Sequence, residues 1–541
     1  MSGSHRPSLA LTLALPALAA IAVYLPALPG GFLSDDYSLL HAFYGVDAHE
    51  VVARVAKTFI SGVGPPSNQY RPLTMASFAL NVALSGADPA AWRIVNVLLH
   101  AANAALVALL AWQLAGESAR GARSAALAAG LAFAWFAPSA EAVAWIAARF
   151  DGMALFWMLA AACTFMMSRH WRDRYGVASL AVTALAFMSK ESAAIGPALI
   201  GALAWTKRPD GEGLFRGIIR ALVTALPWLA IATAYFAFRL WIFGDPFRFY
   251  PGTSPARALL SGQWLGALPA MGDWWPRALP ETGPRNAYTI AGLLLGIGAV
   301  YAGLRDRHEG RVLAAVALAG IAAVALVFSH WGWSATGEGS RVLYAIAAIA
   351  ALAVALPLRM PEPRVRMAAW IVAVALLASG LLLTRGAVER RAQAGAEVRA
   401  LIGALARTAD ALPAHSFAFV IVPDHIGAIP FARNAQGGLM LPPVQPRSIS
   451  PQLVVQLADE LPRWPELLEK NIVGRLKSEP LANVATDPQA PGTALARAMP
   501  DHYYCWSLKS HALVALPLAF APGFRDWDAV WTRALDDAGC R

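Results

Sequence analysis

The stretch VLAAVALAGIAAVALVFSH, residues 312–330, is apolar almost throughout and carries no acidic or basic side chain before His330. A helix of about 20 such residues crosses the ~30 Å hydrocarbon core of a bilayer. Similar runs lie near 8–29, 90–115, 124–138, 150–168, 176–189, 191–206, 217–243, 287–304, 341–358 and 366–385. The sequence therefore predicts an all-α polytopic membrane protein with about eleven transmembrane helices, of which 124–138 and 176–189 are short.

Composition supports this fold class. Only 14% of the 541 residues are charged and the mean hydropathy is +0.48, whereas about 25% of a soluble chain is charged. The net charge of +10 does not indicate a nucleic-acid partner, because the basic residues are distributed over alternate short loops. We therefore expect membrane lipid, and no nucleic acid, among the partners.

The basic loops also predict the topology. They contain Arg120 and Arg123; Arg169, Arg172 and Arg174; Lys207, Arg208, Arg216 and Arg220; Arg305, Arg307 and Arg311; and Arg359, Arg364 and Arg366. Cytoplasmic loops are enriched in Lys and Arg, so the N-terminus is predicted in the cytoplasm and the C-terminus outside. We expect a multi-pass protein of the bacterial inner membrane with a periplasmic C-terminus. The first run could instead be a cleaved signal peptide, but it exceeds the usual apolar core of about 7–15 residues.

Composition changes near residue 386, which predicts two domains, a transmembrane domain at 1–385 and an extracytoplasmic domain at 386–541. The stretch 385–413 alternates charge with Ala and Leu at helical spacing, so the last span should continue as an amphipathic helix. SFAFVIVPD (416–424) is typical of a buried strand and a turn. A small α/β domain of about 130 residues is expected. Cys505 and Cys540 both fall in it, and they either form a disulfide or remain as two thiols.

Two adjacent acids, Asp35 and Asp36, follow the first span in GGFLSDDYSLL (30–40). They could be an ordinary polar exit from the membrane, with Asp35 capping the next helix. They could also be a general base held beside a second carboxylate.

Further ionisable or polar residues gather in the loops assigned to the same side. They are Tyr70, Arg71, Glu141, Arg149, Asp151, Lys190, Glu191, Glu338 and Arg341. Each also has a structural interpretation, such as a snorkelling arginine, a hairpin tip or a helix cap. Glu141, Trp145 and Arg149 recur every four residues and on a helix would share one face. Asn96 and His100, four residues apart in an apolar run, predict interhelical hydrogen bonds.

Several of these segments occur together in a known order. GGFLSDDYSLL, YRPLTMASFALN (70–81), EAVAWIAARFDGMA (141–154), LAFMSKESA (185–193) and GSRVLYAIAAIAAL (339–352) carry the pattern. Over roughly residues 8–385 it resembles membrane glycosyltransferases of the GT-C fold. The likeness is greatest to bacterial relatives of the tetratricopeptide-repeat transmembrane O-mannosyltransferases, although no repeats are visible here.

The resemblance implies an enzyme that moves a sugar from a polyprenyl-phosphate carrier to an acceptor hydroxyl of a glycan, lipid or protein, on the extracytoplasmic face. The catalytic base would come from the acidic pair, with Asp36 favoured over Asp35. The basic positions Arg71, Arg149, Lys190 and Arg341 would hold the donor phosphate. Tyr70, Glu141, Asp151, Glu191 and Glu338 would orient these groups or contact the acceptor. The expected step is an inverting displacement that needs no cofactor and no metal.

The sequence departs from the family pattern at several positions. Ala137-Pro138 stands where relatives often carry His-Pro, and Ala345-Ile346 follows Tyr344 in place of Pro-Ser. The external domain also differs, so the acceptor does not follow from the family. A non-catalytic protein that binds a lipid carrier or scaffolds an envelope complex is the alternative. A secondary transporter is disfavoured, because its charges should lie near the middle of the membrane.

Overall fold

A computed structural model describes residues 8–63, 68–116, 121–209, 211–247, 255–281, 283–329, 334, 337–413, 416, 418–458, 502–518 and 527–540. The chain divides into two compact units. Unit 1 comprises Met1–Leu28, Val46–Ala83 and Ala91–Arg390, and unit 2 comprises Pro29–Gly45, Leu84–Ala90 and Arg391–Arg541. The loop that carries Asp35 and Asp36 therefore groups with the C-terminal part of the chain.

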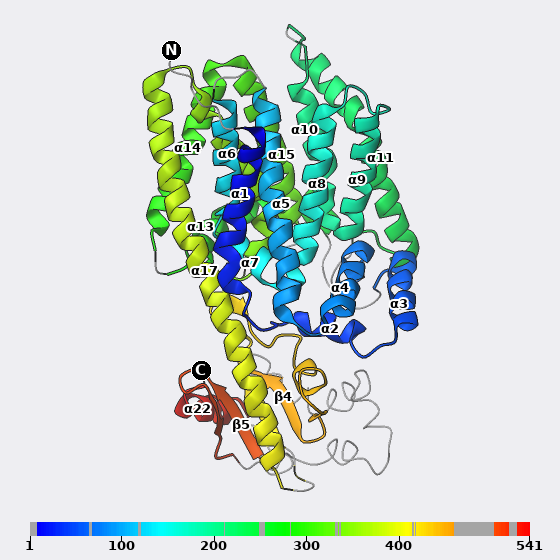
Figure 1. The fold of residues 1–541 in the computed structure, drawn as a ribbon, viewed down its shortest axis with the longest axis vertical. Coiled ribbons are helices and arrows are strands. Elements are labelled where there is room, and N and C mark those ends of the chain that lie inside the picture. The colour runs from blue at the N-terminus through cyan, green and yellow to red at the C-terminus, as the bar shows by residue number, and fades with distance from the viewer. Residues whose placement is uncertain are drawn as a thin grey trace. The chain divides into compact units, whose positions relative to one another are not determined.

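Unit 1 is helical (Figure 1). Its helices are α1 (Leu9–Tyr24), α3 (Ala48–Ser61), α4 (Pro72–Ser85), α5 (Pro89–Ala115), α6 (Ala122–Ala134), α7 (Ser139–Ala144), α8 (Arg149–Met167), α9 (Arg174–Ser189), α10 (Ile195–Thr206), α11 (Leu214–Phe243), α12 (Pro255–Leu260), α13 (Ala267–Ala278), α14 (Arg285–Arg305), α15 (Arg307–Phe328), α16 (Tyr344–Val354) and α17 (Pro363–Ala411). Short 3₁₀ turns precede four of them, namely Ile146–Ala148 before α8, Glu191–Ala194 before α10, Gln263–Gly266 before α13 and Ser340–Leu343 before α16.

The chain is a multi-pass membrane protein. Within the described residues, eight helical segments are long and apolar enough to cross a bilayer. The remaining three predicted runs form the shorter helices α6, α9 and α10, of 13, 16 and 12 residues. All eleven predicted runs are thus helical, and the predicted fold class is confirmed. The predicted extension of the last span is also confirmed, because α17 continues to Ala411 without a break.

Small side chains let the helices of unit 1 approach closely. The core is rich in alanine, for example at Ala104, Ala125 and Ala129, all fully buried. At Gly130 in α6, an added Cβ would lie 2.8 Å from Pro16 of α1 and 2.9 Å from Ala108 of α5. Apolar helices in lipid gain from such close backbone packing. This packing explains why the spans contain so much alanine.

Unit 2 contains helix α2 (Asp36–Phe43), the end of α17 and a small α/β region. The strands are β1 (Ala418–Val422), β2 (His425–Ile426), β3 (Ile429–Pro430), β4 (Leu453–Leu457), β5 (His502–Ser507) and β6 (Ala512–Ala515), and α22 (Trp527–Asp537) follows. The main sheet has the order β4-β1-β5-β6, in which β1 is parallel to β4 and β5, and β6 is antiparallel to β5. All residues of β1 are buried, as the sequence predicted for this strand.

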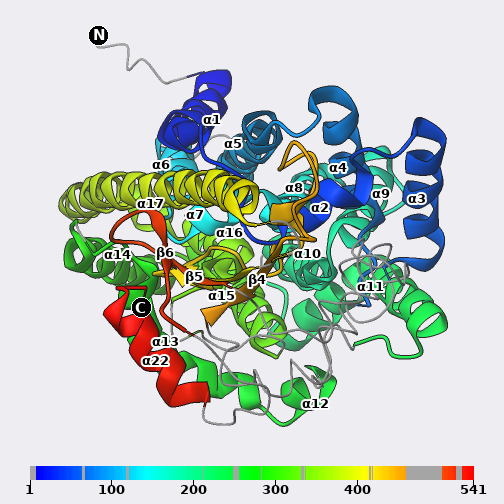
Figure 2. The same cartoon turned by 90° about the horizontal axis from the view of Figure 1, so that it is seen from below.

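Helices cover both faces of this sheet (Figure 2). Trp531 of α22 packs against Phe419 and Tyr503 on one face. Successive side chains of a strand point to opposite faces, and Trp506 faces the other side, where its Nε1 donates to Glu397 of α17 at 3.0 Å. The last part of α17 is therefore a structural element of unit 2.

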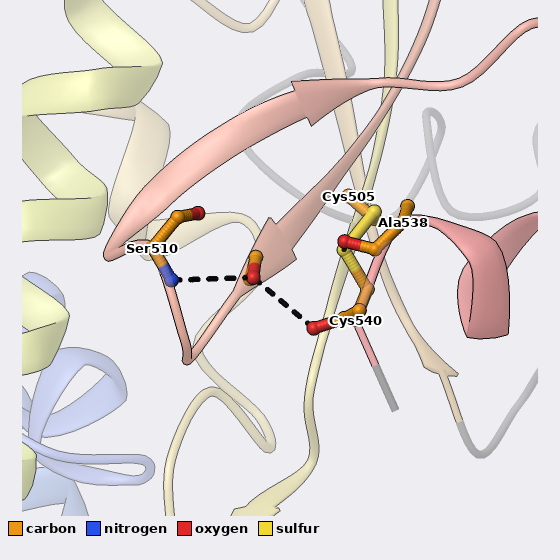
Figure 3. Close-up of a disulfide and its surroundings, with 6 residues drawn as sticks. Cys505, Ser510, Ala538 and Cys540 are labelled. Atoms are coloured by element: carbon orange, nitrogen blue, oxygen red, sulfur yellow. Dashed lines mark hydrogen bonds between the residues drawn. A yellow bond between two sulfur atoms is a disulfide. The ribbon is translucent and has the colours of Figure 1, made fainter.

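A disulfide joins Cys505 of β5 to Cys540 near the C-terminus (Figure 3). The pairing that the sequence left open is thus formed in the structure. Beside it, Ser507 Oγ donates to the carbonyl of Gly539 at 3.1 Å. These contacts hold the segment after α22 against β5.

Removal of this bond by Cys540→Ser is expected to lower the free energy of unfolding of unit 2 by about 2–4 kcal/mol, because the bond restricts the unfolded chain. Thermal unfolding of the detergent-solubilised protein, with and without dithiothreitol, measures the effect. Reductant should lower the melting temperature of the wild type and leave that of the variant unchanged. An equal response of both proteins would contradict the expectation.

Candidate active site

Six ionisable side chains of unit 1 form a series of alternating charge. Arg71 Nε donates to Glu191 Oε2 at 2.9 Å, Lys190 Nζ donates to Asp151 Oδ1 at 2.6 Å, and Arg341 donates to Glu141. The pairs are linked electrostatically, since Lys190 interacts with Glu191 and Arg341 with Asp151. The order Glu141, Arg341, Asp151, Lys190, Glu191, Arg71 therefore places each cation of the series next to a carboxylate.

Helix ends position all six residues. Arg71 precedes α4, which begins at Pro72, and proline is well suited to the first turn of a helix. Lys190 and Glu191 lie where α9 gives way to the 3₁₀ turn before α10. Glu141 and Asp151 lie in the first turns of α7 and α8, and Arg341 lies in the 3₁₀ turn before α16.

These charges are largely buried. Glu141 is 0% exposed, Arg71 6% and Lys190 8%. Burying an ion pair costs about as much in desolvation as its Coulomb attraction returns, and apolar replacements are often as stable or more so. Stability alone therefore does not account for three such pairs together.

Glu141 contacts several groups in and before the 3₁₀ turn that precedes α16. It accepts from the backbone N–H of Gly339 at 3.0 Å, and Ser340 Oγ lies 2.9 Å from its Oε2. Arg341 completes the set, and its guanidinium also stacks over Trp145 at 4.8 Å. Glu338 lies nearby, with Oε1 3.9 Å from Arg341 Nη1. A single carboxylate thus orients Arg341 and the turn before α16.

The helical face predicted for Glu141, Trp145 and Arg149 is wrong. Helix α7 ends at Ala144, and Trp145 has an extended backbone (φ −83°, ψ 120°). The break turns Arg149 away from Glu141 and toward α4 and α5. A four-residue spacing indicates a shared face only while the helix continues.

Arg149 is fully buried and donates to protein groups. Its Nε bonds Asn96 Oδ1 at 2.9 Å, its Nη2 bonds the carbonyl of Trp92 at 2.8 Å, and its Nη1 bonds the carbonyl of Ser77 at 3.2 Å. The guanidinium also stacks over Phe78 at 4.3 Å. These contacts join the start of α8 to α4 and α5.

Tyr70 has a similar packing role. Its hydroxyl donates to the carbonyl of Phe59 at 3.0 Å, and its ring packs against Tyr235 and Phe238 of α11. Tyr70 therefore holds the segment before Arg71 against α3 and α11.

The predicted interhelical bonds of α5 are confirmed. Asn96 Nδ2 donates to the carbonyl of Trp145 at 3.0 Å. His100 Nδ1 lies 2.7 Å from the hydroxyl of Tyr344, which also accepts from Asn103 at 3.3 Å. These bonds connect α5 to the α7–α8 junction and to α16.

Two buried arginines, Arg239 and Arg93, were not identified from the sequence as candidate site residues. Arg239 of α11 is 0% exposed and donates to the carbonyls of Asn68 at 2.9 Å and Pro246 at 3.0 Å. Its guanidinium lies 5.9 Å from the ring centroid of Tyr235, and that ring also packs against Tyr70, the residue before Arg71. Arg93, 2% exposed, donates to the carbonyl of Ala144 at 2.8 Å. A charged residue inside an apolar run was the available signal for both.

The acidic pair belongs to unit 2, and its members differ. Asp36 is 0% exposed and its Oδ2 accepts from the backbone N–H of Leu33 at 3.0 Å. Asp35 is partly exposed and its Oδ1 accepts from Asn434 Nδ2 at 2.7 Å. Asp35 occupies the N-cap position of α2, but its side chain makes no capping bond. The helix-cap alternative is therefore wrong, since this carboxylate binds Asn434 instead.

Sequence comparison relates the chain to known transferases. It is 31% identical over 212 residues to protein O-mannosyl-transferase Tmtc1 of Drosophila melanogaster, a match that covers 36% of this chain and 24% of the relative. It is 41% identical over 95 residues to protein O-mannosyl-transferase TMTC2 of Mus musculus, which covers 17% of this chain and 11% of the relative. These matches confirm the resemblance that the motifs indicated, although the chain matches less than a quarter of each relative's length.

No protein-family model matches the chain. Among solved structures, ArnT from Cupriavidus metallidurans bound to undecaprenyl phosphate has a TM-score of 0.40 and 13% identity, with 84% of this chain and 90% of ArnT covered. The apo form of the same protein has a TM-score of 0.39.

Proposed function

We propose that the chain is a membrane glycosyltransferase that moves a sugar from a polyprenyl-phosphate carrier to an acceptor hydroxyl on the extracytoplasmic side of the inner membrane. The N-terminus would lie in the cytoplasm and the C-terminus in the periplasm. The observation that carries the proposal is the buried series of alternating charges in the segments that resemble the O-mannosyltransferases. Its cost in desolvation is hard to explain by stability alone.

In the proposed reaction, a carboxylate of the acidic pair takes the proton of the acceptor hydroxyl. The acceptor oxygen attacks the anomeric carbon, the bond from that carbon to the phosphate oxygen breaks, and polyprenyl phosphate leaves with the electron pair. The anomeric configuration is inverted. The sugar carbon only exchanges one oxygen for another, so atoms and charge balance without an oxidant or reductant.

The cations would bind the donor phosphate and balance the charge that develops on it as it leaves. Arg71, Lys190 and Arg341 suit this role, because each lies at a helix end and is held by an acidic partner. A guanidinium has five donors, so an arginine already bonded to a carboxylate can also bind a phosphate oxygen. Arg149 is proposed as a further cation for the donor phosphate. Its bonds to Asn96, Trp92 and Ser77 would also fix the backbone around it.

Asp36 is proposed as the base and Asp35 as the second carboxylate. The Asp36 carboxylate is fixed by the N–H of Leu33, and a base with a fixed orientation avoids the cost of ordering it during the reaction. Glu141, Asp151, Glu191 and Glu338 would orient the cations or contact the acceptor. The acceptor is proposed to be a hydroxyl group of a glycan, a lipid or a protein.

A deletion strain tests the proposal. The strain is complemented with the wild type or with the double variant Asp35→Ala/Asp36→Ala, and envelope glycans, lipids and proteins are analysed by mass spectrometry. We expect a sugar modification to disappear in the deletion, return with the wild type and stay absent with the double variant at equal membrane abundance. Full restoration by the double variant would favour the scaffold alternative.

A further inference from the structure

We propose that the C-terminal part of unit 2 holds the acidic pair in its working position, and that Asn434 is a positioning residue for Asp35. The inference rests on the proposed function, because it treats the acidic pair as catalytic. Its structural basis is a set of contacts that hold the loop 29–36 and helix α2 from two sides within unit 2.

Helix α17 provides the first side. An added Cβ on Gly31 would lie 2.6 Å from the carbonyl oxygen of Gly395, and one on Gly395 would lie 2.5 Å from the nitrogen of Gly31. Only two glycines permit so close a contact between backbones. Arg399, one turn later, donates to the carbonyl of Pro29 at 2.8 Å. The loop before the acids is thus fixed on α17.

The segment 431–438, after β3, provides the second side. The N–H of Ser34 donates to the carbonyl of Phe431 at 3.3 Å, and its Oγ donates to that of Arg433 at 2.8 Å. Ser38 Oγ donates to the carbonyl of Asn434 at 3.2 Å. Because Asn434 Nδ2 also donates to Asp35, one residue bonds both the first acid and the next turn of α2.

The end of α2 also contacts the segment 431–438. His41 Nε2 lies 3.1 Å from the carbonyl of Gly438, and a Cβ on Gly438 would lie 2.9 Å from Cβ of Tyr37. The segment therefore follows α2 from its first turn to its last.

Strand β1 anchors that segment. Directly after β1, Asp424 accepts from Arg433 Nη2 at 2.8 Å and lies 2.6 Å from His425 Nδ1. Burial alone would raise the pKa of Asp424, but the bonds from His425 and Arg433 outweigh it and lower the pKa to about 2. The carboxylate stays charged near neutral pH and holds Arg433 next to Asn434.

The sheet topology supports a functional role for the residues at the carboxyl end of β1. Strand β1 lies between β4 and β5 and is parallel to both, so the direction of the strand order changes there. In open α/β sheets, ligands bind outside the carboxyl ends of the strands at such a point. Asp424, which binds Arg433 of the segment that contacts the acidic pair, lies just beyond this end of β1.

Backbone conformation supports the same conclusion. Ser34 and Asn434 are both in the left-handed region, with φ of 50° and 57°. Residues other than glycine adopt it at a cost and keep it where the surroundings hold them, often at functional sites. Ser34 lies in the loop 29–36, and Asn434 lies in the segment 431–438 that contacts this loop.

Asn434→Ala tests the positioning role. It is expected to reduce the transfer rate about 10-fold or more, by loss of a hydrogen bond that orients a carboxylate, with unchanged KM for the donor. In an Asp35→Asn background, the same change should alter the rate less than about twofold. The carboxylate that Asn434 orients is then already lost, and the effects of two interacting residues on the rate do not add. Arg447→Ala, which removes an exposed ion pair with Asp410 elsewhere in unit 2, is the control and should leave the rate unchanged.

The outcomes separate this inference from the proposed function. Wild-type rates for Asn434→Ala, or an equal loss in both backgrounds, would overturn the positioning role while the glycosyltransferase stands. Should the wild type transfer no sugar, the proposed function fails and the catalytic part of this inference fails with it. Hydrogen exchange of 36–43 then reports the contact itself, with faster exchange in the variant if Asn434 holds α2.

Gly395→Ala tests the contact with α17. An alanine normally favours a helix over glycine, but here its Cβ must push the loop at Gly31 away. We expect at least a tenfold loss of transfer and faster hydrogen exchange in 29–36. Gly403→Ala in the same helix is the matched control, because its Cβ would meet only the flexible end of Arg407 at 3.4 Å. Equal behaviour of the two variants would count against the contact.

Discussion

Asp36→Asn is expected to reduce sugar transfer by about 10²–10⁴-fold, the usual contribution of a general base. The amide oxygen of asparagine can still accept from the N–H of Leu33, so the local fold should be kept. The change removes the ability to take a proton from the acceptor. Transfer to the acceptor, followed by mass spectrometry of membranes with matched protein levels, measures the effect.

The two acids should differ in this assay. Asp35→Asn is expected to cost less, about tenfold, because Asp35 is the second carboxylate in the proposal and is partly exposed. Asp47→Asn is the control, since Asp47 caps α3 through the N–H of Glu50 and asparagine caps a helix equally well. The reverse ranking of the two acids would make Asp35 the base, and full activity of both variants would exclude a base in this pair.

Glu141→Gln is expected to destabilise unit 1 by about 3–5 kcal/mol, because it removes the charge of the carboxylate that is hydrogen-bonded to Arg341 in a buried site. Glu141 is completely buried and is hydrogen-bonded to Gly339, Ser340 and Arg341. The expected signs are a lower melting temperature in detergent and lower accumulation in the membrane.

A paired variant distinguishes stability from function. Glu141→Met with Arg341→Met removes both charges, and apolar replacement of a buried pair is often close to neutral. The double variant should therefore recover stability but transfer no sugar, because Arg341 is proposed to hold the donor phosphate. Glu50→Gln is the control, since its pair with Arg54 is exposed and worth less than about 1 kcal/mol. A double variant that transfers sugar normally would remove Arg341 from the proposed site.

Much of the fold is predictable because the membrane leaves few choices. A backbone in hydrocarbon must satisfy its own hydrogen bonds, so an apolar run of about 20 residues becomes a helix. This reasoning identified the spans that form α1, α5 and α8, and local patterns identified β1 and the extension of α17. It failed at Trp145, where an extended residue interrupts a helical spacing without Gly or Pro as a signal.

The sequence by itself determined which residues carry charge at the ends of the helices, and it singled out Asp35 and Asp36. Tertiary structure decided their partners. Arg71 and Glu191 are 120 residues apart, Glu141 and Arg341 are 200 apart, and Asp35 and Asn434 are 399 apart. Periodicity describes neighbours along one helix or strand, whereas partners from different elements meet only when those elements pack. For that reason the chain alone indicated the chemistry, and only the folded unit 2 showed that its C-terminal part holds the acidic pair.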